Sequence, residues 1–314
     1  MSSIVASAKG KLKKRRSAYS KRDMMGLVYI LPWIVGLLIF QLFPFVYSFV
    51  LSFTNRTMSP HVSFIGFQNY VHVFTRDRDF WNVVNVTIRY VLMSVPGRVL
   101  FALLVALLLQ KEMKGMNFFR TLYYLPSIFG GSVAIAIVWR FLFMREGFIN
   151  LLLGTFGLGP VNWLGDPSVA LITVSIVPIW QFGSSMVLFL AALKNVPSTL
   201  YEAAYIDGGG RIRIFFKITL PMISPIILFN VIMQTVGTFQ EFAMPFNIFG
   251  GGGRGPNNSV FLYGVKLYME AFTNFRMGYA SALSWIFFIF ILFVTMIIFV
   301  SSRYWAFYED GRDS

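Results

Sequence analysis

Long apolar segments separated by short polar stretches dominate this 314-residue chain. Six of them reach the roughly 20 residues that a helix needs to cross a bilayer. They cover residues 25–53, 84–110, 122–143, 169–193, 222–246 and 279–302. The first is too long for the apolar part of a signal peptide, and no small-x-small cleavage site follows it. We therefore expect a retained anchor, bent at Pro32 and Pro44, and an all-α membrane protein with six transmembrane helices.

Composition supports a membrane protein and excludes several other classes. Hydrophobic residues make up 56% of the chain and charged residues 13%, with a mean hydropathy of +0.66. A soluble domain carries about one-quarter charged residues. The absence of cysteine excludes disulfides and Cys-ligated metal sites. His61 and His72 lie in an expected loop and suit ordinary loop histidines better than a metal site.

The net charge of +14 would fit a nucleic-acid partner if it covered a folded face. It is concentrated instead in the N-terminal run KGKLKKRRSAYSKR, next to the first apolar segment. A basic run in that position is typical of the cytoplasmic flank of a membrane span. The lipid bilayer, and no nucleic acid, is the partner that this charge indicates.

Lysine and arginine also predict the orientation. One set of loops and tails holds Lys9, Lys11, Lys13, Lys14, Arg15, Arg16, Lys21, Arg22, Lys111, Lys114, Arg120, Lys194, Arg211, Arg213, Lys217, Arg303 and Arg312. The opposite loops hold fewer: Arg56, Arg76, Arg78, Arg140, Arg145, Arg254, Lys266 and Arg276. The positive-inside rule places both termini and the 194–221 loop in the cytoplasm. The expected domains are a basic tail (1–24), a six-span domain (25–302) and a C-terminal tail (303–314).

A polar interruption from Glu202 to Pro225 separates two strongly apolar segments. Pro197 and Ser198 indicate a helix start, and the glycines at 208–210 break that helix because glycine disfavours helix interiors. A second helix is expected to follow along the membrane face, with Pro221 and Pro225 marking re-entry. The residues alone leave two interpretations open: a surface that docks a partner, and an ordinary amphipathic connector.

This interruption resembles the EAA loop of binding-protein-dependent ABC importer permeases. The resemblance rests on EAA-x-x-DG followed by a phenylalanine, I-T-L-P and a second proline. The residues that match are Glu202, Ala203, Ala204, Asp207, Gly208, Phe216, Ile218, Leu220 and Pro221. The runs LPWIVGLLIFQLFPFVYSFVLSF, FFRTLYYLP and FNIFGGGGRGPNNSVFLYGVKLYMEAF resemble the carbohydrate-type subfamily, so the likeness covers essentially the whole chain. Gly209 departs from the family, which more often has alanine there, and this would loosen the turn.

The resemblance implies a type I ABC importer permease fold with a cytoplasmic coupling helix, in the bacterial inner membrane. The implied partners are a homologous second permease subunit, two cytoplasmic ABC ATPase subunits, an extracytoplasmic solute-binding protein and a carbohydrate. On this reading Glu202, Ala203, Ala204, Asp207, Gly208 and Pro221 transmit force to the permease. The chain has no P-loop, so it cannot be the ATPase, and we expect a non-catalytic subunit. We expect no cofactor or metal in this chain; ATP and Mg belong to the ATPase subunits. The glycine-rich run at 250–255 lacks the strand and helix of a dinucleotide site.

Polar residues inside the expected spans are candidates for the substrate pathway, because such residues are costly in a membrane. Asn230, Gln234, Thr238 and Glu241 share one face of the fifth span at about 100° per residue. Amides and carboxylates suit a ligand rich in hydroxyl groups. Hydrogen bonds between helices are the alternative. A weaker candidate with the same alternative lies beside Trp180 and consists of Gln181, Ser184 and Ser185.

Arg89 and Arg98 stand out within the second span. Nine residues apart, they point in opposite directions on a straight helix. For Arg98 one interpretation is structural: it pairs with a buried carboxylate such as Glu241, or with carbonyls at the Pro96 kink. The other is that Arg98 contacts an anionic substrate.

Two further functions stay open for the whole chain: an ATP-independent secondary transporter or channel, and a membrane scaffold that transports nothing.

Overall fold

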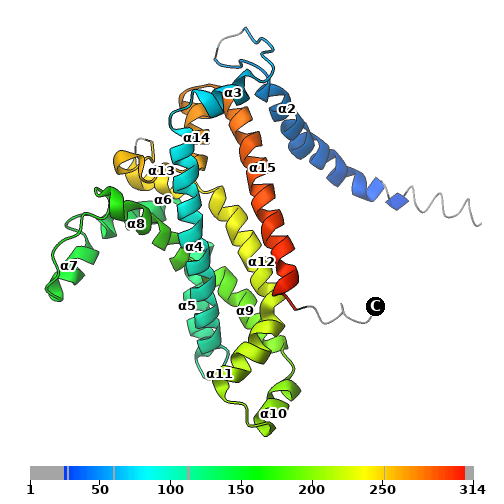
Figure 1. The fold of residues 1–314 in the computed structure, drawn as a ribbon, viewed down its shortest axis with the longest axis vertical. Coiled ribbons are helices and arrows are strands. Elements are labelled where there is room, and N and C mark those ends of the chain that lie inside the picture. Colours follow the sequence, from blue (N-terminus) through cyan, green and yellow to red (C-terminus); the bar gives the residue numbers. More distant parts are fainter. Residues whose placement is uncertain (1–24, 27, 59–60, 112–113, 251, 308–314) are drawn as a thin grey trace, which may run out of the picture.

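The computed structural model describes residues 25–26, 28–58, 61–111, 114–250 and 252–307. The predicted basic tail, residues 1–24, lies outside the described residues, as do residues 308–314 of the predicted C-terminal tail. The described part is an elongated bundle of helices (Figure 1). One end carries α3 (Gln68–Thr75) and the other carries α10 (Ser198–Ile206), and we call them the α3 end and the α10 end.

Within the described residues there are up to six membrane spans, the number that the hydrophobic pattern predicts, when each bent pair of helices is counted as one span. Four are single helices long and apolar enough to cross a bilayer: Val28–Ser52, Phe80–Leu109 (α4), Arg211–Phe239 and Met277–Tyr304. Two are bent pairs. In the first pair, α5 (Met116–Ile128) and α6 (Val133–Leu142) meet at 102°, and in the second, α8 (Pro167–Trp180) and α9 (Gly183–Asn195) meet at 45°.

Three of the predicted segments differ from the observed helices: two are broken in the middle, and one ends earlier than predicted. The segment 122–143 is not one helix, because it breaks after Ile128, where Gly130 has a φ of +46°. The segment 169–193 breaks at Gln181. The fifth span ends at Phe239 rather than 246, and a separate short helix, α13 (Ala243–Phe249), follows. An apolar run shows how much chain can lie in a membrane but not where its direction changes.

Helix α4 forms the centre of the bundle and packs against α8, α9 and α12 (Leu220–Phe239). Small residues let neighbouring backbones approach closely. A Cβ added at Gly97 of α4 would lie 2.6 Å from Cδ1 of Ile179 in α8. A Cβ added at Gly183 of α9 would lie 2.5 Å from the carbonyl oxygen of Tyr123 in α5. These two glycines therefore set the distances between the central helices.

The first span, Val28–Ser52, leans away from the bundle and packs against α15 (Met277–Ser301) (Figure 1). It runs through Pro32 and Pro44 as one span and contains a π-helical turn, η1 (Leu38–Leu42), just before α2 (Phe43–Ser52). Proline removes one helical hydrogen bond, and the wider turn accommodates that loss. None of the most apolar part of this span is buried within the chain.

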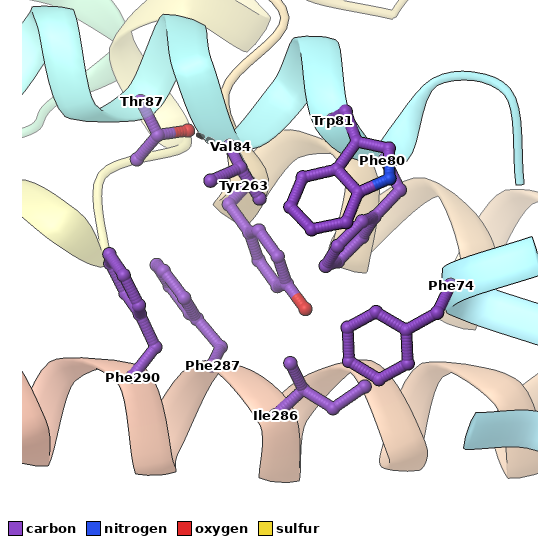
Figure 2. Close-up of a pocket in the computed structure, with 9 residues that line it drawn as sticks. All are labelled: Phe74, Phe80, Trp81, Val84, Thr87, Tyr263, Ile286, Phe287 and Phe290. Carbon is purple, nitrogen blue, oxygen red and sulfur yellow. Dashed lines mark hydrogen bonds between the residues drawn. The ribbon is translucent and has the colours of Figure 1, made fainter. Parts of the chain in front are cut away.

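An apolar cavity of about 240 Å³ lies between α3, α4, α14 (Tyr263–Tyr268) and α15 (Figure 2). The ring of Tyr263 stacks on Phe287, with centroids 4.0 Å apart. The backbone N–H of Tyr263 donates to Oγ1 of Thr87 over 2.9 Å, and its hydroxyl donates to the Leu283 carbonyl over 2.8 Å. These contacts fix α14 between α4 and α15.

Further short helices are α7 (Phe148–Thr155), η3 (Pro256–Asn258), η4 (Met269–Thr273) and η5 (Ser302–Tyr304).

Candidate functional site

Helix α10 carries the EAA residues on an exposed projection at the α10 end (Figure 1). None of its nine residues is buried, and Glu202 and Ala203 are exposed. Two large apolar side chains at its end are also exposed, Tyr205 at 59% and Ile206 at 87%. The hydroxyl of Tyr201 lies 3.1 Å from Oγ1 of Thr219 and links α10 to the bundle. A short helix with exposed apolar residues is typical of a surface that a partner covers.

A tight turn ends α10 at the residues expected to break the helix. Gly208 has a φ of +73°, which favours glycine. The N–H of Asp207 donates to the Ala203 carbonyl over 3.0 Å, and the N–H of Gly209 donates to the Ala204 carbonyl over 2.8 Å. A Cβ at Gly209 would lie 2.7 Å from that Ala204 oxygen. The turn is therefore closed at Gly209 rather than loosened.

The second helix of the loop differs from the prediction. It does not lie separately along a membrane face, because α11 (Arg211–Ile214), the π-helical turn η2 (Phe215–Thr219) and α12 form one continuous 29-residue helix. Pro221 lies inside that continuous helix, just after η2, and the wider π-helical turn accommodates the hydrogen bond that proline cannot make. A displacement of α10 would therefore act on the end of one continuous transmembrane helix through a turn of three glycines.

A polar cluster joins the breaks in the two bent spans. Nε2 of Gln181 donates to the Gly130 carbonyl over 2.8 Å, and Oγ of Ser127 donates to the Gln181 carbonyl over 3.1 Å. The N–H of Ser184 in turn donates to Oγ of Ser127 over 3.0 Å. Backbone groups freed at a helix break must be satisfied where water is excluded. Gln181, a predicted pathway residue, thus also stabilises the break opposite it.

Sequence reasoning missed Ser127, although it has two hydrogen-bond partners in this cluster. The signal lay in the order Pro126, Ser127 and, shortly after, two adjacent glycines within an apolar segment. That order marks a helix break with a polar group beside it.

Arg98 points into the bundle from α4. Its Nη2 donates to Oγ of Ser184 over 3.3 Å, and its Nε is buried without a hydrogen-bond partner. The expected ion pair with Glu241 is absent from the described part of the chain. Glu241 lies beyond the end of α12 instead, where its Oε1 accepts from the N–H of Met244 over 3.1 Å.

Three of the four residues predicted to form the polar face of the fifth span lie on α12, and the fourth, Glu241, lies beyond its end. Nε2 of Gln234 donates to Oγ of Ser185 over 3.0 Å, so two predicted pathway residues from different spans meet. Asn230 is buried; its amide donates to the Ile226 carbonyl over 3.0 Å, and its Oδ1 has no partner. Thr238 is buried near the end of α12. Arg98, Gln234 and Asn230 thus offer polar atoms with unused capacity inside the bundle.

Comparison with known proteins identifies the family. Residues 78–308 match the family described as "Binding-protein-dependent transport system inner membrane component". The chain is 44% identical to the probable ABC transporter permease protein YesP of Bacillus subtilis (strain 168), over 96% of this chain and 97% of YesP. It is 32% identical to the lactose transport system permease protein LacF of Rhizobium radiobacter, over 90% of this chain and 95% of LacF.

A solved structure has the same fold. It is a chain of a bacterial ABC transporter involved in the import of the acidic polysaccharide alginate. The TM-score is 0.79 at 23% identity, over 92% of this chain and 98% of that one. The chain therefore belongs to the inner-membrane component family of binding-protein-dependent transport systems, and the predicted permease fold is confirmed.

Proposed function

We propose that this membrane component is one of two permease subunits of an ATP-driven carbohydrate importer, with α10 as the helix that couples transport to ATP hydrolysis. The observation that carries the proposal is the exposed α10, which bears the EAA residues on a short tether to a transmembrane helix. The likeness to the lactose permease protein along most of both chains supports a carbohydrate substrate. In this arrangement the two ATPase subunits, which bind ATP and Mg, and the α10 end lie in the cytoplasm. A solute-binding protein delivers the sugar at the α3 end.

Alternating access follows from this arrangement. When the ATPase subunits close, each moves the α10 that it holds. Since α11, η2 and α12 form one helix, the movement reaches Gln234 and Asn230 without an intervening hinge. The polar face of α12 would then open to one side of the membrane or the other. The homologous second subunit would supply the opposite wall.

Uptake in proteoliposomes that contain the whole complex tests the coupling role. Glu202→Lys reverses the charge on the exposed face of α10, and Gly208→Pro prevents the φ of +73° that ends the helix. We expect either variant to lower ATP-dependent uptake at least about tenfold while all subunits still co-purify, a loss of about 1.4 kcal/mol of coupling. Glu146→Lys, at an exposed position in a loop, is the matched control. Unchanged uptake in both α10 variants would reject the coupling role.

The unpartnered Nε of Arg98 extends the proposal to an acidic carbohydrate. A cation near the centre of a membrane costs at least about 2.5 kcal/mol, and one hydroxyl neighbour does not offset that cost. A carboxylate on the passing sugar would supply the missing acceptor, because charge-assisted hydrogen bonds are the stronger kind. Asn230, Gln234, Thr238 and Ser185 would serve its hydroxyl groups.

Arg98→Gln tests this extension, because glutamine keeps polar atoms there and removes the charge. We expect uptake of trigalacturonate to fall about tenfold or more and uptake of neutral galactotriose to fall much less, since charge-assisted hydrogen bonds contribute about 1.5–3 kcal/mol. The measurement is the ratio of the two uptake rates in the same proteoliposomes. Equal losses for both sugars, with the complex intact, would remove the acidic substrate from the proposal and leave the importer standing.

A further inference from the structure

The outward face of α4 borders a polar cleft of about 720 Å³, of a size that can hold a small ligand. Its other wall is the start of α8, and the loop after η3 closes one side. The lining residues of α4 are Trp81, Asn82, Asn85, Val86, Arg89 and Met93. Asn85 and Arg89 follow Asn82 by three and seven residues, so the three side chains leave the helix within an arc of about 60°. Ser168 of α8 and Ser259 add two hydroxyl groups.

The Ser168 hydroxyl donates to Oδ1 of Asp166 over 2.7 Å and keeps only its capacity to accept. The other polar groups of the cleft have hydrogen-bonding capacity that the protein does not use. Within the described part of the chain, neither Arg89 nor Asn85 has a hydrogen bond or ion pair to another residue, and both are exposed. Oγ of Ser259 is buried without a partner. Asn82 makes one long hydrogen bond, 3.4 Å, to the Asn258 carbonyl. A transmembrane helix that keeps a free guanidinium and a free amide on one face is expected to bind something there.

The cleft is separate from the polar cluster inside the bundle. Arg89 and Arg98 are nine residues apart on the same helix, so their side chains leave it in opposite directions. Arg98 reaches inward to Ser184 of α9, while Arg89 faces the gap beside α8. A ligand in this cleft would therefore not contact Arg98.

The chemistry of the lining selects among anionic ligands. A planar guanidinium binds a carboxylate with two parallel hydrogen bonds. The two amides and two hydroxyls around it suit the hydroxyl groups of a sugar, and the indole of Trp81, which is 63% exposed, offers a flat apolar surface at the rim. A lipid phosphate would be served by several cations, but Arg89 is the one cation among the lining residues.

We propose that this cleft between α4 and α8 is a second binding site for an acidic oligosaccharide, in which Arg89 binds a carboxylate and Asn82, Asn85, Ser168 and Ser259 bind hydroxyl groups. The inference rests on the proposed carbohydrate function and adds a site outside the bundle interior. Such a site would hold the sugar near the α3 end of α4, one face away from the interior cluster.

The absence of cysteine allows the cleft to be observed directly. Ile172→Cys, at the exposed rim on α8, takes a nitroxide label. Leu108→Cys, 73% exposed near the other end of α4, is the control position. The full complex, with cysteine-free partner subunits, is placed in phosphatidylcholine nanodiscs without ATP. Nuclear magnetic resonance then measures how strongly each label broadens the signals of added trigalacturonate, with galactotriose as the neutral comparison.

We expect broadening of trigalacturonate by the Ile172 label and none by the Leu108 label. Arg89→Gln should weaken the apparent affinity about tenfold or more, and Arg89→Lys should weaken it less. Galactotriose should be broadened much less than trigalacturonate. Equal broadening in wild type and Arg89→Gln, or none in either, would overturn the proposal.

A lipid headgroup is the competing occupant, and a second nanodisc composition distinguishes it. If broadening disappears when one third of the lipid is phosphatidylglycerol, the cleft binds an anionic headgroup and the sugar site is rejected. If broadening persists, the sugar site is supported. Because no ATP is present, a failure of the coupling role of α10 would leave these results unchanged, so the two proposals fail separately.

Discussion

At the scale of single residues, two helical glycines make opposite predictions for the same substitution. Gly183 faces the α5 backbone so closely that an added Cβ would lie 2.5 Å from the Tyr123 carbonyl oxygen and 2.7 Å from Cα of Tyr124. Gly237 in α12 has no atom within 4 Å of that position. Gly183→Ala must therefore push α5 and α9 apart, at a cost of about 1–3 kcal/mol. Gly237→Ala should instead stabilise its helix by up to about 1 kcal/mol.

Thermal unfolding of the purified protein in detergent separates the two effects. We expect a lower midpoint for Gly183→Ala and an equal or higher one for Gly237→Ala. Gly183→Ala also alters the neighbourhood of Ser127 and Ser184, so its uptake should fall with its stability. A midpoint for Gly183→Ala that matches the wild type would mean that α5 and α9 are not held at this distance.

At the scale of elements, one buried ion pair fastens the α3 end. Lys266 of α14 is 3% exposed, and its Nζ lies 2.7 Å from Oδ2 of Asp77, between α3 and α4. The hydroxyl of Tyr279 in α15 donates to the same carboxylate. Removing one partner of a buried pair costs about 3–5 kcal/mol, because it leaves an uncompensated charge. Lys266→Met should therefore lower the free energy of unfolding by several kcal/mol.

The pair of Arg254 and Asp79 provides a control in the same region. These side chains are 42% and 39% exposed, with Nη1 of Arg254 3.8 Å from Oδ2 of Asp79. An exposed pair contributes about 0–1 kcal/mol, so Arg254→Met should change the unfolding midpoint little. Similar losses of stability in both variants would show that burial does not increase the contribution of the Lys266–Asp77 pair to folding.

The same end of the molecule should lose stability in acid. Burial raises the pKa of Asp77, but hydrogen bonds from Lys266 and Tyr279, the charge of Lys266 and the N–H of Asp79 outweigh it and hold the pKa below its usual value. Burial and the charge of Arg276 lower the pKa of His72. Each folded group thus binds a proton less tightly than its unfolded form. Stability is complete above pH 6.5, begins to fall below it through His72, and falls again below about pH 4 through Asp77.

Unfolding midpoints measured between about pH 2 and pH 8 check this order. His72→Gln should remove the loss that begins below about pH 6.5 and leave the one at lower pH. A wild-type profile that is flat from pH 8 to pH 5 would contradict the contribution of His72.

At the scale of the whole molecule, the sequence predicted the number of spans and the position of α10 better than it predicted the site. Hydropathy measures how long a segment can remain in a membrane, so the four single helices and the two bent pairs of the described residues each correspond to a predicted segment. Hydropathy does not report where a helix changes direction, so the 102° break after Ile128 was missed. The pair of Arg98 with Glu241, one of the predicted options, was wrong. The observed neighbour, Ser184, is 86 residues away along the chain, and only the packing of α9 on α4 brings it near. Contacts between spans depend on packing, which no periodicity reports.

At this scale, the predicted orientation of the molecule in the membrane can be tested directly. We predict from the positive-inside rule that α10 is cytoplasmic and that the α3 end is outside. Since the chain has no cysteine, Val62→Cys (44% exposed, near α3) and Tyr205→Cys (59% exposed, in α10) each introduce one reactive site. A membrane-impermeant maleimide added to intact spheroplasts should label Val62→Cys, and it should label Tyr205→Cys only after permeabilisation. The opposite pattern would place α10 outside, where no ATPase could reach it, and would reject the coupling role together with the orientation.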